Sequence, residues 1–256
     1  MLVIGMGRIG RMFRALNIDV VPAREFLDGD QACLTSTDLV VHAAGPAGDA
    51  ACCENPGGAF AAHYMLTDRL VDWALERGDR RLVLLGTVAP NIGFYGPLKR
   101  AAIANAQRRT VGEAQSRLLI IECGQVIGEG IDPLGSGVIG EFVLAAVKGQ
   151  PIEVFGGQQT IRYTSLHGLI DLICTNRWPN VRILSPVSPP IPVLDLAKIC
   201  ARIAYLRFGV LENIVEWTAP LTPSYEAPTG VILPVQDCAT TLLKWMCEIH
   251  AIESRS

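Results

Sequence analysis

The feature that most constrains the fold is a glycine-rich turn at the start of the chain. Gly5, Gly7 and Gly10 follow a short apolar segment, Met1–Ile4, and precede helix-like apolar spacing over Ile9–Leu16. Glycines in this context let the backbone approach a pyrophosphate, and the following helix N-terminus adds amide donors. The segment therefore predicts the first strand, turn and helix of a dinucleotide-binding unit. The alternative is a tight turn that binds no ligand.

Apolar strands alternate with helical segments over the first half of the chain. The segment Asp38–Ala44 is typical of a buried strand, Phe60–Arg77 has the period and length of a helix, and Arg81–Leu85 is typical of the next strand. This order predicts an α/β fold with a doubly wound parallel sheet of the Rossmann type.

The pattern changes after residue 124, where a glycine-rich stretch, Gly124–Gly140, predicts a loop. The rest of the chain predicts a small C-terminal substrate lobe. We therefore expect a dinucleotide-binding domain over residues 1–124 and a mainly substrate-binding lobe over 125–256. A helix over 164–176 is expected to return to the first domain.

Composition excludes several classes of protein. Half of the 256 residues are apolar, which is enough for a sizeable core, and a net charge of −3 gives no general attraction to nucleic acid or anionic membranes. No apolar run reaches the roughly 18 residues that a membrane span needs. The eight cysteines include no C-x-x-C pair and no zinc-site spacing. We expect reduced thiols, no metal and a cytoplasmic protein.

A tyrosine, a lysine and a threonine form a possible catalytic set. Lys99 follows Tyr95 by four residues, which places both on one side of a helix, and Thr87 ends the apolar strand before them. The ammonium group would favour the ionised phenol and hold a cofactor ribose. Such a phenol can exchange a proton with a substrate oxygen while hydride moves to a nicotinamide. The alternative is a half-buried aromatic residue and a solvated charge.

Two charged residues follow the second expected strand, Asp19–Val21, and bear on the choice of cofactor. A carboxylate such as Glu25 would hold a ribose 2′-hydroxyl, whereas a guanidinium such as Arg24 would hold a 2′-phosphate. Both NAD and NADP stay open; Arg24 favours NADP because it lies nearer the strand end.

Together these segments resemble the extended short-chain dehydrogenase/reductases that act on nucleotide sugars, over nearly the whole chain. Val40–Ala44 resembles the family's fourth strand, Thr87, Tyr95 and Lys99 match its Ser/Thr-Tyr-Lys set, and His63 stands where the family usually carries an asparagine. The resemblance implies substrate contacts from Gln125 and Arg162, a proton relay through His63 and, as in many relatives, a homodimer. The expected cofactor contacts are Gly5, Gly7, Arg8, Ile9, Gly10, Arg24, Ala43, Ala44, Gly45, Tyr95 and Lys99.

Departures from the family narrow the expected reaction. Val88–Ala89 follows Thr87 in place of the acidic pair of the 4,6-dehydratases, which argues against dehydration. Glu122 stands where an arginine is common. We expect an NAD(P)-dependent enzyme acting on a hydroxyl or keto carbon of a sugar, as an epimerase or a keto-reductase. The short segment between Thr87 and Tyr95 supports the alternative, a non-catalytic dinucleotide-binding sensor or assembly subunit.

Overall fold

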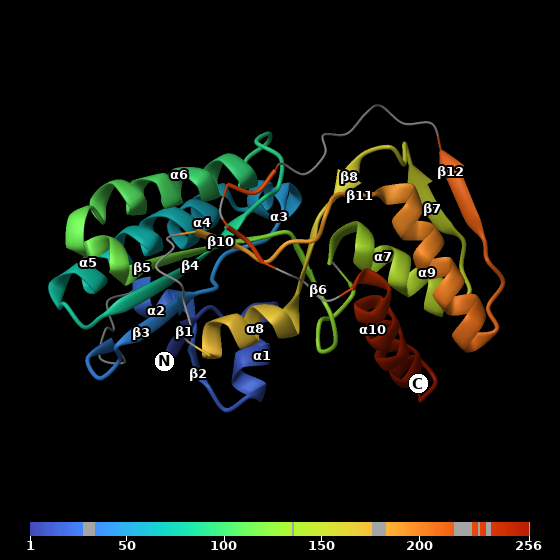
Figure 1. Cartoon of the computed structure of the whole chain (residues 1–256), viewed down its shortest axis with the longest axis horizontal. Helices are drawn as coiled ribbons and strands as arrows, with labels where there is room; N and C mark the ends of the chain where they lie inside the picture. The colour runs from blue at the N-terminus through green and yellow to red at the C-terminus, as the bar shows by residue number, and fades with distance from the viewer. Residues whose placement is uncertain are drawn as a thin grey trace. The chain divides into compact units, whose positions relative to one another are not determined.

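The computed structural model describes residues 1–27, 34–134, 136–175, 183–217, 227–229, 231–233 and 237–255 (Figure 1). These residues form two compact units. The first contains Met1–Glu122 and two later strand segments, 183–185 and 231–232, and the second contains most of the remaining chain. No helix in the described ranges is both long enough and apolar enough to cross a bilayer.

A seven-stranded sheet forms the centre of the first unit, in the order β13-β10-β5-β4-β3-β1-β2. Its strands are β1 (Leu2–Ile4), β2 (Asp19–Val21), β3 (Leu39–His42), β4 (Arg81–Thr87), β5 (Leu118–Cys123), β10 (Ile183–Ser185) and β13 (Val231–Ile232). β1 pairs in parallel with both β2 and β3, β3 with β4, and β10 with both β5 and β13. The α/β fold class predicted from the sequence is confirmed.

The order of the strands predicts a ligand crevice at the carboxyl ends of β1 and β3. The chain leaves β1 for β2 on one side and then passes to β3 on the other side, so the winding direction reverses there. Open α/β sheets bind ligands at the carboxyl ends of the strands that flank such a reversal. The glycine turn follows β1, and residues 43–45 follow β3, so both segments meet at this crevice.

Helices cover both faces of this sheet. They are α1 (Arg8–Ala15), α2 (Ala23–Leu27), α3 (Asp49–Glu54), α4 (Pro56–Phe60), the π-helical turn η2 (Ala61–Met65), α5 (Leu66–Glu76), α6 (Tyr95–Arg109) and the 3-10 turn η3 (Gly112–Arg117). In Figure 1, α5 and α6 lie on one side of the sheet and α1 on the other. An ion pair of 2.5 Å between Asp68 and Arg109 links α5 to α6.

The helix expected over Phe60–Arg77 begins earlier than predicted. α4, η2 and α5 follow one another directly from Pro56 to Glu76. The side chain of Asn55 accepts a hydrogen bond of 2.9 Å from the amide of Gly58, and a proline at the first helical position needs no donor there. Both start signals lie before the apolar period that predicted the helix.

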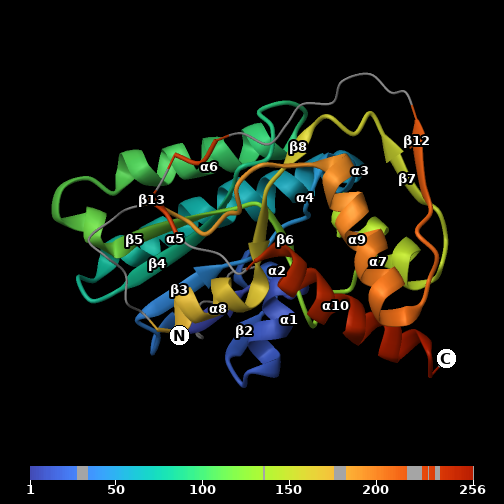
Figure 2. The same cartoon turned by 45° about the vertical axis from the view of Figure 1, so that its right-hand side comes forward.

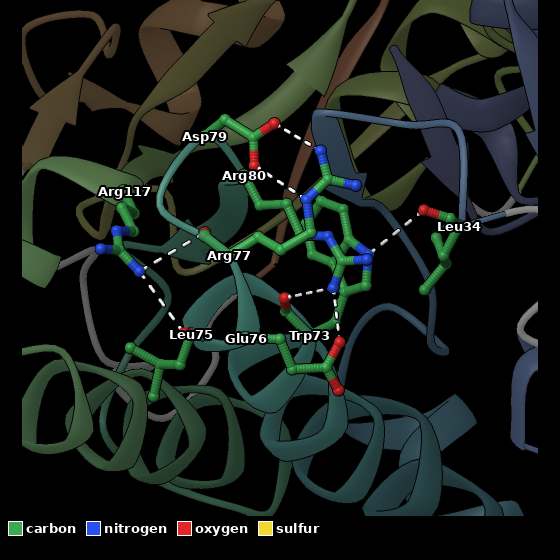
Figure 3. Close-up of polar contacts among 8 residues, drawn as sticks. All are labelled: Leu34, Trp73, Leu75, Glu76, Arg77, Asp79, Arg80 and Arg117. Atoms are coloured by element: carbon green, nitrogen blue, oxygen red, sulfur yellow. Dashed lines mark hydrogen bonds and ion pairs between the residues drawn. The ribbon is translucent and has the colours of Figure 1, made fainter.

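A polar cluster fixes the turn between α5 and β4 (Figure 3). The guanidinium of Arg80 lies 5.0 Å from the ring centroid of Trp73 and donates to the Trp73 carbonyl at 2.9 Å. It also pairs with Glu76 at 2.6 Å, and the Trp73 indole donates to the carbonyl of Leu34. These contacts set where β4 begins and thereby fix the strand whose far end carries Thr87.

The second unit combines three packed helices with short strand pairs. Its elements are β6 (Gln125–Ile127), α7 (Gly137–Val147), β7 (Ile152–Phe155), β8 (Thr160–Ile161), β9 (Tyr163–Ser165), α8 (Leu166–Cys174), β11 (Ile191–Pro192), α9 (Val193–Phe208), β12 (Ile214–Trp217) and α10 (Cys238–Glu253). α7 packs against both α9 and α10, and Figure 2 shows the three helices side by side. The completely buried Trp245 of α10 donates to the carbonyl of Ile131 at 2.8 Å.

Two sequence expectations need comment in this unit. The predicted loop over Gly124–Gly140 is wrong in part, because it contains β6 and the first turn of α7. β6 is only three residues long and depends on parallel pairing with β9, Gln125 opposite Tyr163, which no local pattern reveals. α8 belongs to the second unit, whereas the sequence predicted a helix that returns to the first domain. That return stays a prediction. Residue 176, the expected end of this helix, lies outside the described residues.

Candidate active site

The three glycines of the first turn have different structural reasons to be glycine. Gly5 has φ +126, and a Cβ there would lie 2.6 Å from the amide nitrogen of Ala44. A Cβ on Gly10 would overlap the carbonyl oxygen of Gly5. Gly7 has an ordinary φ of −70, and a Cβ there would meet nothing within 4 Å. The fold therefore requires Gly5 and Gly10 but leaves open space at Gly7.

The space in front of Gly7 fits the phosphates of a dinucleotide. Gly7 is the N-cap residue of α1, where no side chain caps the helix and the first turn carries no acidic residue. Amide groups and the positive end of the helix dipole favour an anion at this place. A side chain at Gly7 would fill the cradle, so the glycine suits a ligand that passes there. Arg8 and Ile9, both partly buried, form the first turn of this helix.

Residues 43–45 lie against the glycine turn at the end of β3. The amide of Ala43 donates to the carbonyl of Ile4 at 2.9 Å, and the amide of Ala44 donates to Nδ1 of His42 at 3.2 Å. Gly45 has φ +108, a conformation that L side chains rarely adopt. The structure thus brings together the two backbone segments predicted to line the cofactor.

Arg24, the expected contact for the 2′-phosphate of NADP, follows the second strand. It is exposed on α2, three residues beyond the end of β2, and Glu25 beside it is also exposed. Both side chains therefore lie just after the second strand. The choice between NAD and NADP depends on the residues at these positions.

His63 packs directly behind Gly45. Its Nε2 lies 2.8 Å from the carbonyl oxygen of Pro46, so Nε2 carries the proton and Nδ1 does not. Burial and the nearby Lys99 ammonium lower the pKa of His63 to about 3, although the Pro46 bond acts the other way. The imidazole is therefore neutral near pH 7. Its ring meets the ring of Tyr95 edge-on, with centroids 5.7 Å apart.

The π-helical turn explains how His63 reaches this position. A π turn widens the helix by one residue and is frequent at functional sites. The hydroxyl of Thr67 donates to the carbonyl of His63 at 2.7 Å, which satisfies a carbonyl within the widened turn. A proton relay through His63 stays a prediction, and the neutral ring behind Gly45 points instead to positioning of the loop.

The three residues of the predicted catalytic set lie on two neighbouring elements, β4 and α6. Thr87 ends this strand, Tyr95 is the first residue of α6, and Lys99 follows one turn later. The Nζ of Lys99 donates to the carbonyl of Leu85 at 2.8 Å, two residues before Thr87. The Oγ1 of Thr87 accepts from the amide of Ala89 at 3.0 Å, which leaves its own hydrogen to donate to a substrate oxygen.

Asp49 is a site residue that the sequence reasoning missed. Its Oδ1 accepts hydrogen bonds from the amides of Phe94 at 2.7 Å and Tyr95 at 2.8 Å. An aspartate after a glycine signals a helix start, here that of α3. Nothing in the local sequence connects it to α6, which begins 46 residues later.

The two predicted substrate residues are neighbours in the second unit. The amide of Gln125 donates to the carbonyl of Arg162 at 2.9 Å. The Gln125 side chain donates to the carbonyl of Ser136, and Nη1 of Arg162 donates to that of Ser188 at 2.9 Å. The Nε of Arg162 is buried and has no hydrogen-bond partner among the described residues. In both side chains, one donor group is thus already bonded to a backbone carbonyl.

Glu122, which replaces a common arginine, has a structural role. Its carboxylate accepts from the hydroxyl of Ser185 at 2.8 Å, from the amide of Thr229 at 2.8 Å and from the Thr229 hydroxyl at 2.5 Å. It links the end of β5 to β10 and to the residue two places before β13. This position therefore serves the edge of the sheet in this chain.

Several solved enzymes share the fold of this chain. A UDP-glucose 4-epimerase from Thermotoga maritima, solved with UDP-glucose, is similar with a TM-score of 0.76 and 13% identity, covering 98% of this chain and 99% of that one. The NAD complex of a UDP-glucose 4-epimerase from Thermus thermophilus gives 0.71 and 15%, covering 97% and 98%. A dTDP-glucose 4,6-dehydratase from Bacillus anthracis gives 0.73 and 12%, covering 99% and 97%.

These identities establish a shared fold, and the family follows from the sequence itself. A search of curated proteins gives no significant match. Residues 28–167, more than half of the chain, match the sequence family described as the NAD dependent epimerase/dehydratase family. The chain belongs to the NAD-dependent epimerase/dehydratase family.

Proposed function

We propose that this protein catalyses NAD(P)-dependent hydride exchange at a hydroxyl or keto carbon of a sugar, with a nucleotide sugar as substrate. The observation that carries the proposal is the bond from Lys99 of α6 to the carbonyl of Leu85, which joins the helix that begins at Tyr95 to the end of β4, where Thr87 lies. This end of the sheet is the ligand-binding end of the fold. The family assignment and the sugar-nucleotide enzymes among the similar structures support the substrate class.

The residues that would hold the dinucleotide belong to three segments of the first unit. The open N-terminus of α1 at Gly7 would receive the phosphates, residues 43–45 would line the crevice, and Lys99 would bind the nicotinamide ribose. When bound, a nicotinamide dinucleotide accepts or returns the hydride of the reacting carbon. The exposed Arg24 supports NADP, whereas the exposed Glu25 would suit NAD.

Acid and base roles fall to side chains on α6 and β4. Tyr95 would take the proton of the sugar hydroxyl during oxidation and return it during reduction. The Lys99 ammonium would favour the ionised phenol, while its bond to the Leu85 carbonyl keeps it beside β4. Thr87 would donate its hydroxyl hydrogen to the reacting oxygen, because the bond from the amide of Ala89 uses only an acceptor lone pair of the hydroxyl.

The residues that follow Thr87 support epimerisation or ketone reduction over dehydration. Loss of water from a sugar needs an acid and a base at the adjacent carbon. Val88 has a buried apolar side chain and Ala89 ends in a methyl group, so neither position offers a proton. The similar 4,6-dehydratase shares the fold at 12% identity and carries no weight on this point.

Two further properties belong to the proposal. The planar guanidinium of Arg162, whose Nε is unpaired among the described residues, suits the oxygens of a diphosphate and supports a nucleotide-linked sugar. We also propose a homodimer. Its interface would be formed by the helical segment 60–77, which contains α5, and by the helix over 95–107, which lies in α6. The exposed Phe60 and Met65, which lie on the helical segment that ends in α5, support it.

One experiment tests the proposed reaction and separates its two forms. The purified protein is incubated with a panel of UDP- and dTDP-linked sugars and keto sugars, with NAD, NADP or their reduced forms. An epimerase converts the sugar with catalytic amounts of cofactor and no net change in absorbance at the nicotinamide wavelength. A keto-reductase consumes one reduced cofactor for each product. Cofactor binding without conversion of any sugar would contradict the proposal.

A non-catalytic dinucleotide-binding role is the competing candidate. The observation in its favour is that Gln125 and Arg162 both donate to backbone carbonyls of their own unit. Under that reading, the protein binds the cofactor but converts no sugar, so Tyr95→Phe has no turnover to slow. The same panel therefore decides between the two candidates.

A further inference from the structure

The start of α6 lacks a capping side chain of its own. The residues immediately before Tyr95 are Gly93 and Phe94, and neither carries a polar side chain. The first amides of a helix have no partner within the helix, so a cap must come from elsewhere or from water. This matters at α6 because its first residue is the proposed acid/base group.

Asp49 supplies that cap from a distant part of the chain. Its Oδ1 accepts from the amides of Phe94 and Tyr95 at 2.7 and 2.8 Å, lengths typical of bonds to a charged acceptor. Gly93 has φ +68, and a Cβ there would lie 2.5 Å from both Oδ1 and Cγ of Asp49. The carboxylate therefore lies where only a glycine can precede Phe94.

The place of Asp49 in the chain connects the two halves of the proposed site. It is the first residue of α3, and the residues just before it include the loop 43–46 that meets the glycine turn and His63. At the other end of the short segment 88–94, Arg100 donates to the carbonyl of Ala89 and to the side chain of Asn91, each at 3.0 Å. The shortened segment is thus held at both ends.

We propose that Asp49 is a positioning residue, which fixes the backbone of Tyr95 relative to the cofactor-binding loop. This inference rests on the proposed function, because it assigns a catalytic consequence to the placement of Tyr95. In this role Asp49 acts through the backbone of Tyr95. It replaces the ordering that a longer segment before the tyrosine would give.

The test compares three variants of the full chain. Asp49→Ala removes the acceptor, Asp49→Asn keeps an acceptor oxygen without the charge, and Glu54→Ala removes an exposed carboxylate from the same helix. We expect Asp49→Ala to lower kcat about 10- to 100-fold, as misplaced catalytic groups do, with KM and cofactor affinity nearly unchanged. Asp49→Asn should restore most of kcat, and Glu54→Ala should behave as the unchanged protein.

Several outcomes would overturn this role. An unchanged kcat in Asp49→Ala, or a loss confined to KM, would do so. An Asp49→Asn variant as slow as Asp49→Ala would also do so, because asparagine keeps the accepting oxygen.

A second measurement separates this inference from the proposed function. Hydrogen exchange of the Phe94 and Tyr95 amides needs no substrate. We expect slow exchange in the unchanged protein and in Asp49→Asn, and faster exchange in Asp49→Ala. Equal exchange in all variants overturns the positioning role whatever the activity. The expected exchange pattern in a protein that converts no sugar supports the placement of Tyr95 by Asp49 and counts against the proposed reaction alone.

Discussion

The imidazole ring of His63 occupies the place where any side chain of Gly45 would begin. A Cβ on Gly45 would lie 2.5 Å from Nδ1 of His63. The same ring donates through Nε2 to the carbonyl of Pro46, the next residue. A buried histidine on the long helical segment thus supports the turn that lines the proposed cofactor crevice, and it does so in its neutral form.

Protonation of His63 should make the fold sensitive to acid. Its pKa in the fold is about 3, below the ordinary 6.5, so the unfolded chain binds the proton more tightly. The stability from neutral His63 is complete above pH 6.5 and is lost as the pH falls from 6.5 toward 3. Between pH 7.5 and 4.5 this loss amounts to roughly 2–3 kcal/mol.

Urea unfolding of His63→Asn at those two pH values checks this prediction. The difference in unfolding free energy between them should be smaller in the variant. It should not vanish, because burial also holds the pKa of His42 well below its ordinary value. His167→Asn, at an exposed histidine of α8, is the control and should keep the full difference. Equal pH dependence in His63→Asn and the unchanged protein would contradict the neutral assignment.

Gly7→Val should abolish dinucleotide binding and leave the fold intact. The Cβ of the valine would project into open space at the N-terminus of α1, so thermal unfolding should change little. Gly10→Ala is the contrasting variant, because its Cβ would overlap the Gly5 carbonyl and cost about 2 kcal/mol or more of stability. Fluorescence titration with NAD and NADP measures binding. Unchanged cofactor affinity in Gly7→Val would remove the glycine turn from the site.

Tyr95→Phe should bind cofactor normally and turn over substrate at least about 100-fold more slowly. The ring keeps its contact with His63, whereas the transferable proton is lost with the hydroxyl. Steady-state kinetics with the sugar identified by the panel give kcat, and cofactor titration gives the binding control. Near-normal turnover would show that another group transfers the proton and that this site differs from the family pattern.

Local sequence patterns predicted the parts of the site whose residues are close together in the chain. The turn from Gly5 to Gly10 follows its strand directly, and Tyr95 and Lys99 share one helix turn. The spacing of these residues along the chain indicates their role, so strand, turn and helix could be assigned before their contacts were known.

The remaining parts depend on contacts between distant segments. Asp49 caps a helix that begins 46 residues later, and Glu122 binds Thr229 across 107 positions. Isolated acidic residues of this kind are usually solvated surface groups, so neither stands out in a sequence. The π turn at His63 differs from an α-helix by one residue and leaves the apolar period almost unchanged.

Arg24→Ala should weaken NADP binding about 10- to 100-fold and leave NAD binding nearly unchanged, since only NADP offers a 2′-phosphate. Glu25→Ala is the paired variant, because a carboxylate at this place would hold the 2′-hydroxyl of NAD. Calorimetric titration of both variants with both cofactors gives four affinities. Equal losses for NAD and NADP in Arg24→Ala would contradict a preference for NADP, and a loss confined to NAD in Glu25→Ala would assign NAD as the cofactor.

Arg162→Ala should raise the KM for a nucleotide-linked sugar about tenfold and leave cofactor affinity unchanged. The Nη1 of the guanidinium donates to the carbonyl of Ser188, and its buried Nε has no partner among the described residues. Donor groups therefore remain for a diphosphate. Arg162→Lys keeps the charge without the planar fork and should recover only part of the affinity. Arg202→Ala, at an exposed arginine of α9, controls for loss of charge in the same unit.

The KM for a free sugar without the diphosphate should be unchanged in all three variants. Titration of the cofactor-loaded protein with nucleoside diphosphates tests the interaction directly. If none binds while Arg162 is intact, the substrate is not a nucleotide sugar, and reduction of a simpler keto compound becomes the better account of the same catalytic set.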